Sequence, residues 1–203
     1  MFITFEGIDG SGKSTQAKAL VAALEAAGKP CIWTREPGGS TGAEAIRKLL
    51  VEGDPDRWSA ETELLLFNAA RRDHLEKTIE PALARGAVVV CDRYVDSTRV
   101  YQGVARADLR EVVDLIHKTM IKREADLTFI IDIDPETSLT RGLARKSGED
   151  RFEDMGLDFQ KRLRAGFLDL AAQYPDRCHV IDGAQNVQAV ERAIWAAYQG
   201  ALS

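Results

Sequence analysis

The sequence lacks the features that mark several large classes of protein. It has only three cysteines in 203 residues, and no two of them have the spacing of a metal-binding pair. No run approaches the ~20 apolar residues of a membrane-spanning helix, and no basic segment precedes an apolar stretch at the start. The formal net charge of −5 argues against a broad surface for nucleic acid or for an anionic membrane. We therefore expect a cytoplasmic protein that binds neither, although a small basic pocket remains compatible with this charge.

The cysteines also give no sign of a disulfide framework. Cys31, Cys91 and Cys178 are odd in number, and each lies in or beside a short apolar run. We expect three reduced side chains that are buried and behave as small hydrophobic groups.

Short apolar runs alternate with longer stretches of helical periodicity, without internal repeats or low-complexity tracts. Strands are predicted at residues 2–6, 30–34, 87–91, 127–133 and 177–181. Helices are predicted at residues 13–27, 43–51, 60–85 with a break near Pro81, 108–123, 135–144, 158–173 and 187–199. This alternation predicts an α/β fold with a five-stranded parallel sheet and helices on both of its faces. The nearly continuous valine run at 87–91 is typical of a strand that is buried on both sides.

The length of the chain suits one domain, which we expect to span residues 1–203. Its most irregular part is the charged segment at about 144–156, which contains two glycines and lies between two predicted helices. Such a segment suits a mobile active-site lid or a plain surface loop, and the residues alone favour neither.

A phosphate-binding motif follows the first predicted strand. Residues 7–14 read Gly-Ile-Asp-Gly-Ser-Gly-Lys-Ser and match G-x-x-x-x-G-K-[ST] at every fixed position, with a helix beginning at the end of the match. Glycines let backbone N–H groups surround phosphate oxygens, and the helix N-terminus adds positive charge. We therefore predict a P-loop NTPase fold in which a triphosphate is bound by Gly7, Asp9, Gly10, Ser11, Gly12, Lys13, Ser14 and Thr15.

Two residues of this loop carry the chemistry. Lys13 would neutralise the β- and γ-phosphates, and Ser14 would offer its hydroxyl to Mg²⁺. We expect Lys13 at the surface, packed against nothing. A P-loop predicts triphosphate binding, but it does not distinguish a GTPase, a motor ATPase and a small-molecule kinase.

The end of the valine run adds a second charged cluster. Asp92 follows a buried strand, at the position where a P-loop protein holds the Mg²⁺ shell. Arg93 should project over the crevice at the carboxyl ends of the strands, where an arginine suits a bidentate grip on phosphate. A surface arginine paired with a carboxylate is the alternative.

The stretch at 60–85 contains an aromatic residue and an arginine on one helix face. Phe67 and Arg71 are four residues apart, so they could stack a nucleotide base and donate to its edge. Taken alone, each residue has a simpler interpretation, with Phe67 in the core and Arg71 on a solvated face.

Further segments form an ordered pattern over essentially the whole chain. They are Phe5–Thr15, Thr34–Gly39, Leu66–Arg71, Asp92–Tyr94, Asp96–Thr98, Tyr101–Gly103, Asp150–Glu153 and Val180–Asp182. In this order they resemble the bacterial thymidylate kinases, a family of P-loop nucleoside monophosphate kinases. The resemblance implies Mg²⁺-dependent transfer of the γ-phosphate of ATP to dTMP, giving dTDP for dTTP synthesis. It also implies a homodimer packed through helices, for which residues 60–85 and 108–123 are the longest candidates.

The resemblance implies a role for each matching residue. Thymine would stack on Phe67, with Arg71, Gln102 and Thr98 at its edge. The acceptor phosphate would be bound by Arg93 with help from Arg35 or Arg47, and Tyr101 would lie against the sugar. Two carboxylates, those of Asp9 and Glu36, would lie by the sugar 3′-hydroxyl and the waters of the magnesium, and residues 182–187 would border the adenine.

One departure from the family pattern concerns the catalytic arginine. Some members carry an arginine in the P-loop where this chain has Gly10, so the charge would come from the segment at 144–156. That segment holds Arg145, Lys146 and Arg151. Arg141 lies just before it and would bind the ATP. Which of these arginines acts is open. We expect the catalytic set to comprise Lys13, Asp9, Arg93, Arg151 and Arg145.

Two alternatives compete with the thymidylate kinase prediction. One is a kinase of the same architecture that acts on another nucleotide or on a nucleoside. The other is a nucleotide-binding switch that catalyses nothing. A switch needs no acceptor site, so the second anion site expected at Arg93 favours a kinase.

Overall fold

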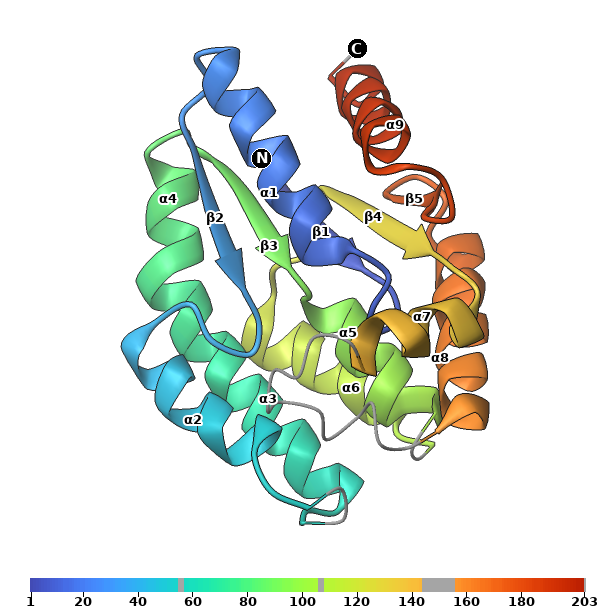
Figure 1. Ribbon diagram of the computed structural model, residues 1–203. Helices are drawn as coiled ribbons and strands as arrows, with labels where there is room; N and C mark the ends of the chain where they lie inside the picture. Colours follow the sequence, from blue (N-terminus) through green and yellow to red (C-terminus); the bar gives the residue numbers. More distant parts are fainter. Residues whose placement is uncertain (55–56, 106–107, 144–155, 203) are drawn as a thin grey trace.

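A parallel sheet of five strands forms the centre of this computed structural model (Figure 1), which describes residues 1–54, 57–105, 108–143 and 156–202. The strands are β1 (Phe2–Glu6), β2 (Cys31–Arg35), β3 (Val88–Asp92), β4 (Leu127–Asp132) and β5 (Cys178–Asp182). Their order is β2-β3-β1-β4-β5, and every neighbouring pair is parallel. This confirms the predicted five-stranded parallel sheet, with strand ends displaced by about one residue.

Helices cover both faces of the sheet, as predicted. Ile3 and Phe5 of β1 pack against α1 (Lys13–Ala26) and α9 (Val187–Gly200) on one face. Phe2 points to the other face and packs among residues of the second group of helices. Because successive side chains of a strand alternate between faces, Thr4 and Glu6 share the face of Phe2.

The second face is covered by the remaining helices of the described chain. They are α3 (Ala60–His74), α4 (Glu80–Ala84), α5 (Val95–Val100), α6 (Arg110–Ile116) and α8 (Leu157–Gln173), while α2 (Thr41–Val51) packs on α3 and α7 (Pro135–Leu143) packs on α8. Three π-helical turns continue helices of this group, at Leu75–Ile79, Tyr101–Ala105 and His117–Ile121.

The observed helices differ from the predicted ones in two places. The stretch at 60–85 does not break at Pro81, because a π-helical turn at residues 75–79 links α3 to α4 and proline occupies the first turn of α4, where no N–H is needed. The helix α5 was not predicted at all. Its buried residues include Asp96, Thr98 and Arg99, so the apolar period that identifies a helix in sequence is absent.

All three cysteines are free, and two of them, Cys91 and Cys178, are buried as predicted. Burial raises the pKa of the Cys91 thiol well above its usual range and that of Cys178 to about 12. Cys31, on the edge strand β2, is only partly buried. No helix in the described part of the chain is long and apolar enough to cross a membrane.

Candidate active site

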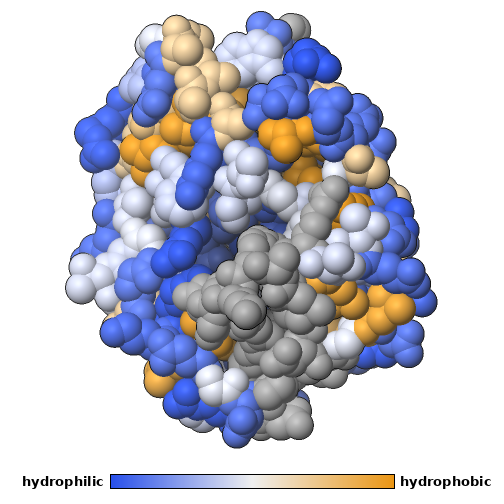
Figure 2. Space-filling view, in the orientation of Figure 1, coloured by the Kyte–Doolittle hydropathy of each residue, from blue (hydrophilic) through white to orange (hydrophobic). Residues whose placement is uncertain are grey.

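A cleft of about 330 Å³ lies at the carboxyl ends of β1, β2 and β3. Hydrophilic side chains line the recess near the middle of the face that Figure 2 shows. The structure brings together there most of the residues predicted from sequence, namely Asp9, Gly10, Gly12, Lys13, Ser14, Arg35, Glu36, Arg47, Phe67, Arg71, Asp92, Arg93, Thr98, Tyr101 and Gln102.

The other predicted residues do not line this cleft. Gly7, Ser11 and Thr15 belong to the same loop and to the start of α1, outside the lining. Arg141 lies in the last turn of α7, whose side chains there are outside the described part. Arg145, Lys146 and Arg151, with the rest of the predicted lid, also lie outside the described residues.

The predicted phosphate loop runs from β1 to the first turn of α1. Gly10 has a φ of 83°, and a Cβ atom at this position would overlap the carbonyl oxygen of Ser138 on α7. The Ser138 hydroxyl also donates to the carbonyl oxygen of Asp9. The loop as folded therefore has no room for a side chain at this position.

Lys13 is not the exposed residue that we expected. It is 6% exposed, and its Nζ donates to the carbonyl oxygen of Ile8 at 2.6 Å. Burial lowers the pKa of Lys13, as does the nearby Arg93 guanidinium, and Asp9, Asp92 and Glu6 only partly oppose this, leaving it at about 8. The ammonium of Lys13 is therefore bonded to a carbonyl of its own loop.

Ser14 and Asp92 form a pair of oxygen ligands between the loop and the end of β3. The Ser14 hydroxyl donates to Oδ2 of Asp92. Hydroxyl and carboxylate oxygens are hard ligands of the kind that Mg²⁺ prefers, and this ion commonly keeps several waters. The residues present therefore fit a magnesium site. Elsewhere in the described chain, no three His, Cys, Asp or Glu side chains converge as a metal site.

Arg93 lies inside the cleft, with a side chain that is 17% exposed. Its Nη2 atom pairs with Asp9 and also donates to the Tyr101 hydroxyl at 3.2 Å, while Nη1 donates to Ser97 Oγ at 2.9 Å. Burial alone would raise the pKa of Asp9, but the Arg93 and Lys13 cations hold it at about 2. The alternative interpretation, a surface arginine paired with a carboxylate, is right about the ion pair and wrong about its location, because both residues line the cleft.

The side chain of Arg71 is 1% exposed, so its placement on a solvated face was wrong. Its Nε donates to Glu36 Oε2 at 2.7 Å, and its Nη2 donates to Thr98 Oγ1 at 3.0 Å. Glu36 is also contacted by His74, whose Nδ1 lies 3.1 Å from Oε1 and whose Nε2 lies 2.6 Å from Thr34 Oγ1. The third guanidinium nitrogen, Arg71 Nη1, is buried and has no hydrogen-bond partner among the described residues.

Phe67 and Gln102 line the cleft beside Arg71. Phe67 is half-buried and faces the cleft, so the simpler interpretation as a core residue was wrong. Gln102 is 1% exposed, and its Nε2 donates at 3.0 Å to the fully buried Glu63. Arg47 reaches the edge of the cleft, where its Nη1 donates to the Pro37 carbonyl at 2.6 Å.

Sequence reasoning missed several residues around the cleft. Its lining also includes Lys18, Trp33, Pro37, Val51, Tyr94 and Ser97. Behind the lining lie Glu6, Glu63, His74 and Ser138, each of which is buried and contacts a lining residue or the P-loop. Ser97 lies within a segment that matched the family pattern, whereas no signal in the sequence pointed to Trp33 or Ser138.

Comparison with known proteins assigns this architecture to one family. The family model of thymidylate kinase matches residues 5–194. A thymidylate kinase of Dinoroseobacter shibae is 70% identical over 181 residues, which cover 89% of this chain and 87% of the relative. One of Ruegeria pomeroyi is 63% identical over 190 residues, covering 94% and 90% respectively. The crystal structure of thymidylate kinase from Ehrlichia chaffeensis superimposes with a TM-score of 0.79 at 37% identity and covers 98% of both chains.

Proposed function

The chain belongs to the thymidylate kinase family, and we propose that its cleft transfers the γ-phosphate of ATP to thymidine monophosphate, giving thymidine diphosphate for dTTP synthesis in the cytoplasm. One observation carries the assignment of an acceptor. Besides Lys13, the same cleft holds the cation of Arg93, together with an aromatic ring and a buried guanidinium. A nucleotide switch binds a triphosphate alone and does not need these additional groups for a second ligand.

The base-binding part suits thymine. The half-buried ring of Phe67 offers a flat surface for stacking, and the unpaired Nη1 of Arg71 is a donor that needs an acceptor. Thymine presents its O4 oxygen as an acceptor, where cytosine presents an amino group. Thr98 and Gln102 lie on either side of Arg71 in this proposal and contact the remaining base edge.

The phosphate-binding part depends on Arg93. Its guanidinium is held in the cleft by Asp9, Ser97, Tyr101 and the Gly7 carbonyl, so both of its terminal nitrogens are already directed. In the proposal, Arg93 holds the acceptor phosphate with Arg47 or Arg35 beside it, and Tyr101 lies against the sugar. Glu36, fixed by Arg71 and His74, lies by the 3′-hydroxyl with Asp9.

The donor part uses the P-loop, from Gly7 to Thr15. In this proposal Lys13 leaves the Ile8 carbonyl and bonds the β- and γ-phosphates of ATP. Mg²⁺, when bound at Ser14 and Asp92, would neutralise phosphate charge. The turn after β5 lies next to this loop, because a Cβ on Gly183 would stand 3.5 Å from the Ser11 carbonyl oxygen. Residues 182–187 are therefore well placed to border the adenine.

The chemistry needs positioning and charge neutralisation more than proton transfer, because the acceptor is already a phosphate oxyanion. Lys13 and Arg93 supply charge from opposite sides of the transferred group. We assign the remaining positive charge to Arg145 or Arg151 in a lid at 144–156, and we propose that Arg141 contacts the ATP. In this proposal residues 1–203 form one kinase domain.

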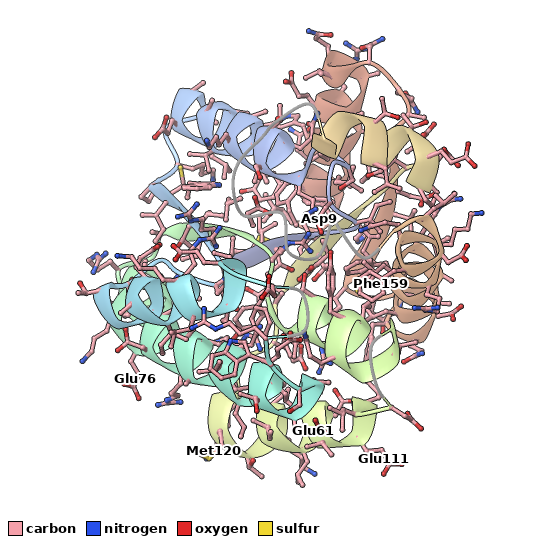
Figure 3. All side chains as sticks on the ribbon, turned by 60° about the horizontal axis from the view of Figure 1, so that its bottom comes forward. Asp9, Glu61, Glu76, Glu111, Met120 and Phe159 are labelled. Carbon is pink, nitrogen blue, oxygen red and sulfur yellow. The ribbon has the colours of Figure 1, made fainter. Side chains whose placement is uncertain are left out.

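We also propose that the chain forms a homodimer through α3 and α6. Apolar side chains are exposed along these helices and the π-helical turn after α6, where Leu65, Leu115 and Met120 are 64%, 60% and 60% exposed. Exposed apolar groups gathered on neighbouring helices favour association with another apolar surface. Figure 3 shows Met120 at the rim of the molecule and Asp9 near the middle of the view, so a partner bound here would leave the cleft open.

A coupled ADP-release assay with a panel of monophosphates tests this function. We expect dTMP to be preferred, and dUMP, which lacks one methyl group, to be used roughly 10–200-fold less well. Rejection of dCMP should be stronger, because its amino group would face the Arg71 donor. Equal use of dTMP and dCMP would contradict the role of Arg71. A clear preference for AMP or GMP would point to another kinase of the same architecture.

A further inference from the structure

The last residue of β1, Glu6, is a buried carboxylate that lies near the cations Arg93 and Lys13 but forms no ion pair with either of them. Its side chain is 0% exposed, and it has no ion pair among the described residues. One oxygen, Oε1, accepts from the backbone N–H of Tyr94 at 2.7 Å. The other, Oε2, accepts from the Ser97 hydroxyl at 2.6 Å. Both contacts lie beside Arg93, which the proposed function uses to bind the acceptor phosphate.

The backbone of Arg93 needs such support. Its φ is 67°, in the left-handed region that residues with a side chain rarely adopt. A backbone of this kind persists only when the surrounding structure holds it. The N–H of Arg93 donates to the Phe5 carbonyl at 2.9 Å, and the following N–H, that of Tyr94, donates to Glu6. The end of β1 therefore holds the strained residue from both sides.

The side chain of Arg93 depends on the same carboxylate. Nη1 of Arg93 donates to Ser97 Oγ at 2.9 Å, and a guanidinium can only donate. Ser97 must then give its single proton to another acceptor, and that acceptor is Glu6. The carboxylate thus sets the direction of the hydroxyl, and the hydroxyl sets the position of Nη1.

Keeping a carboxylate here is costly for the fold. Burial raises the pKa of Glu6 to about 7, and the nearby Asp96 contributes in the same direction, while Ser97, Arg93 and the Tyr94 N–H lower it only in part. A group that only filled this space would be better neutral. Residues that are unfavourable for stability and lie against a site are candidates for a functional role.

We propose that Glu6 is a positioning residue for phosphoryl transfer, which holds the backbone and the guanidinium of Arg93 in the geometry that binds the acceptor phosphate. This inference rests on the proposed role of Arg93. Glu6 touches neither substrate in this arrangement and acts only through Tyr94 and Ser97.

Steady-state kinetics of matched variants test the proposal. Glu6→Gln keeps the volume, but an amide has only one acceptor oxygen, so whichever way it turns, either the Ser97 hydroxyl or the Tyr94 N–H faces a donor and loses its acceptor. We expect kcat/KM for dTMP to fall about 10²-fold, the effect of a small displacement of a group in the site, with KM for ATP little changed. Ser97→Ala should show a smaller loss of the same kind, and Ser97→Thr, which keeps the hydroxyl, should restore most of the activity.

Thr4→Val is the matched control. Thr4 lies on the same strand and face as Glu6, is 0% exposed, and shares a 2.8 Å hydrogen bond with Thr128, and neither threonine lines the cleft. Its replacement should lower the melting temperature and leave both KM values unchanged. A double Glu6→Gln, Ser97→Ala variant should lose less than the product of the two single effects, because both act through one chain of contacts.

The outcomes separate this proposal from the proposed function. Unchanged dTMP kinetics in a folded Glu6→Gln variant would overturn the role of Glu6, as would an equal rise of KM for ATP. If Glu6→Gln does not fold, the proposal is tested by comparing the dTMP kinetics of Ser97→Ala and Ser97→Thr. Equal activity of these two variants would overturn the proposal. A wild type that prefers another monophosphate would refute the proposed substrate, and the same variants would then be measured with that acceptor.

Discussion

The two halves of the cleft are built in different ways. In the donor half, Lys13 and Ser14 belong to one contiguous loop, and Lys13 is held by a carbonyl five residues away. In the acceptor half, Arg71 is held by Glu36 and Thr98, which lie 35 and 27 residues away in the chain. A short motif can encode a site made of backbone amides, whereas a site made of ion pairs exists only after distant segments have packed together.

The two halves also differ in how the hydrogen-bond donors of their cations are paired. Lys13 makes one hydrogen bond within its own loop and must exchange that contact to bind a phosphate. Arg71 already has partners for Nε and Nη2, but it leaves Nη1 buried without a partner among the described residues. We infer that the acceptor half is assembled before its substrate arrives, and that the donor half rearranges when the triphosphate binds. The following predictions test this contrast.

The largest effect is expected from removing the charge of the donor half. Because Lys13 is buried, Lys13→Met tests the charge without opening a cavity. We expect kcat to fall about 10³-fold, as for other groups that neutralise developing charge, with KM for dTMP little changed. Circular dichroism would confirm that the variant is folded. Normal turnover by the folded variant would refute the P-loop assignment.

Removing the centre of the acceptor half should affect activity and stability together. Arg71→Ala leaves Glu36 buried with only His74 beside it, and breaking a buried pair typically costs about 3–5 kcal/mol. We expect kcat/KM for dTMP to fall at least about 10²-fold, because the base loses a hydrogen-bonding donor. Thermal unfolding and initial rates measure the two effects.

The neighbouring arginine provides the control for that experiment. Arg72 pairs with Glu76 on the surface, and both side chains are nearly half exposed. Arg72 also donates to the Met120 carbonyl at 2.9 Å, so Arg72→Ala should lower the melting temperature slightly and leave the kinetics unchanged, since exposed ion pairs contribute little. Similar losses in both variants would mean that Arg71 acts through general helix stability and not through the base.

A conservative change at Arg93 should have a smaller but selective effect. Lysine keeps the charge but cannot direct separate donors to Asp9, Ser97 and the phosphate. For Arg93→Lys we expect KM for dTMP to rise about 10-fold, on the scale of one lost charge-assisted hydrogen bond, and kcat to fall as well, with KM for ATP unchanged. A rise in KM for ATP alone would move Arg93 to the donor half.

The smallest effect concerns pH and again distinguishes the halves. With its pKa lowered to about 8, Lys13 of the free enzyme loses its proton as the pH rises from 7 to 9. The value of kcat/KM for ATP should fall up to about 10-fold over this range, since that quantity reports the free enzyme. In Lys13→Arg the step should disappear, because a guanidinium does not titrate there. A step that persists in this variant would belong to another group.

Much of the fold could be predicted because it depends on local patterns. The valine run of β3 and the strand–loop–helix at 2–26 appear in the sequence as short apolar runs, a glycine-rich turn and a helical period. The helix α5 could not be predicted, because its buried Asp96 and Arg99 are stabilised by ion pairs with Arg177 and Glu124 from elsewhere in the chain. When the buried residues of a helix are polar and pair with distant parts of the chain, the sequence lacks the apolar periodicity from which a helix is predicted.

The site shows the same division. Lys13, Ser14 and Asp92 were placed correctly in the cleft from motif and strand position, but the burial of Lys13 was missed. Taken singly, Phe67 and Arg71 suggested a core residue and a solvated one, and only the family resemblance placed them in the site. Burial depends on what packs against a side chain, and a single residue type carries little information about that.

By itself, the sequence determined the parallel sheet, the phosphate loop and the carboxylate at the end of β3, because each follows from backbone geometry over a few neighbouring residues. Only the tertiary structure decided which carboxylate orients Arg71, that His74 supports Glu36, and that Glu6 holds Arg93 through Tyr94 and Ser97. The physical reason is that these groups are charged or polar and lie far apart in the chain. Their buried positions become favourable only when packing brings each one to its partner.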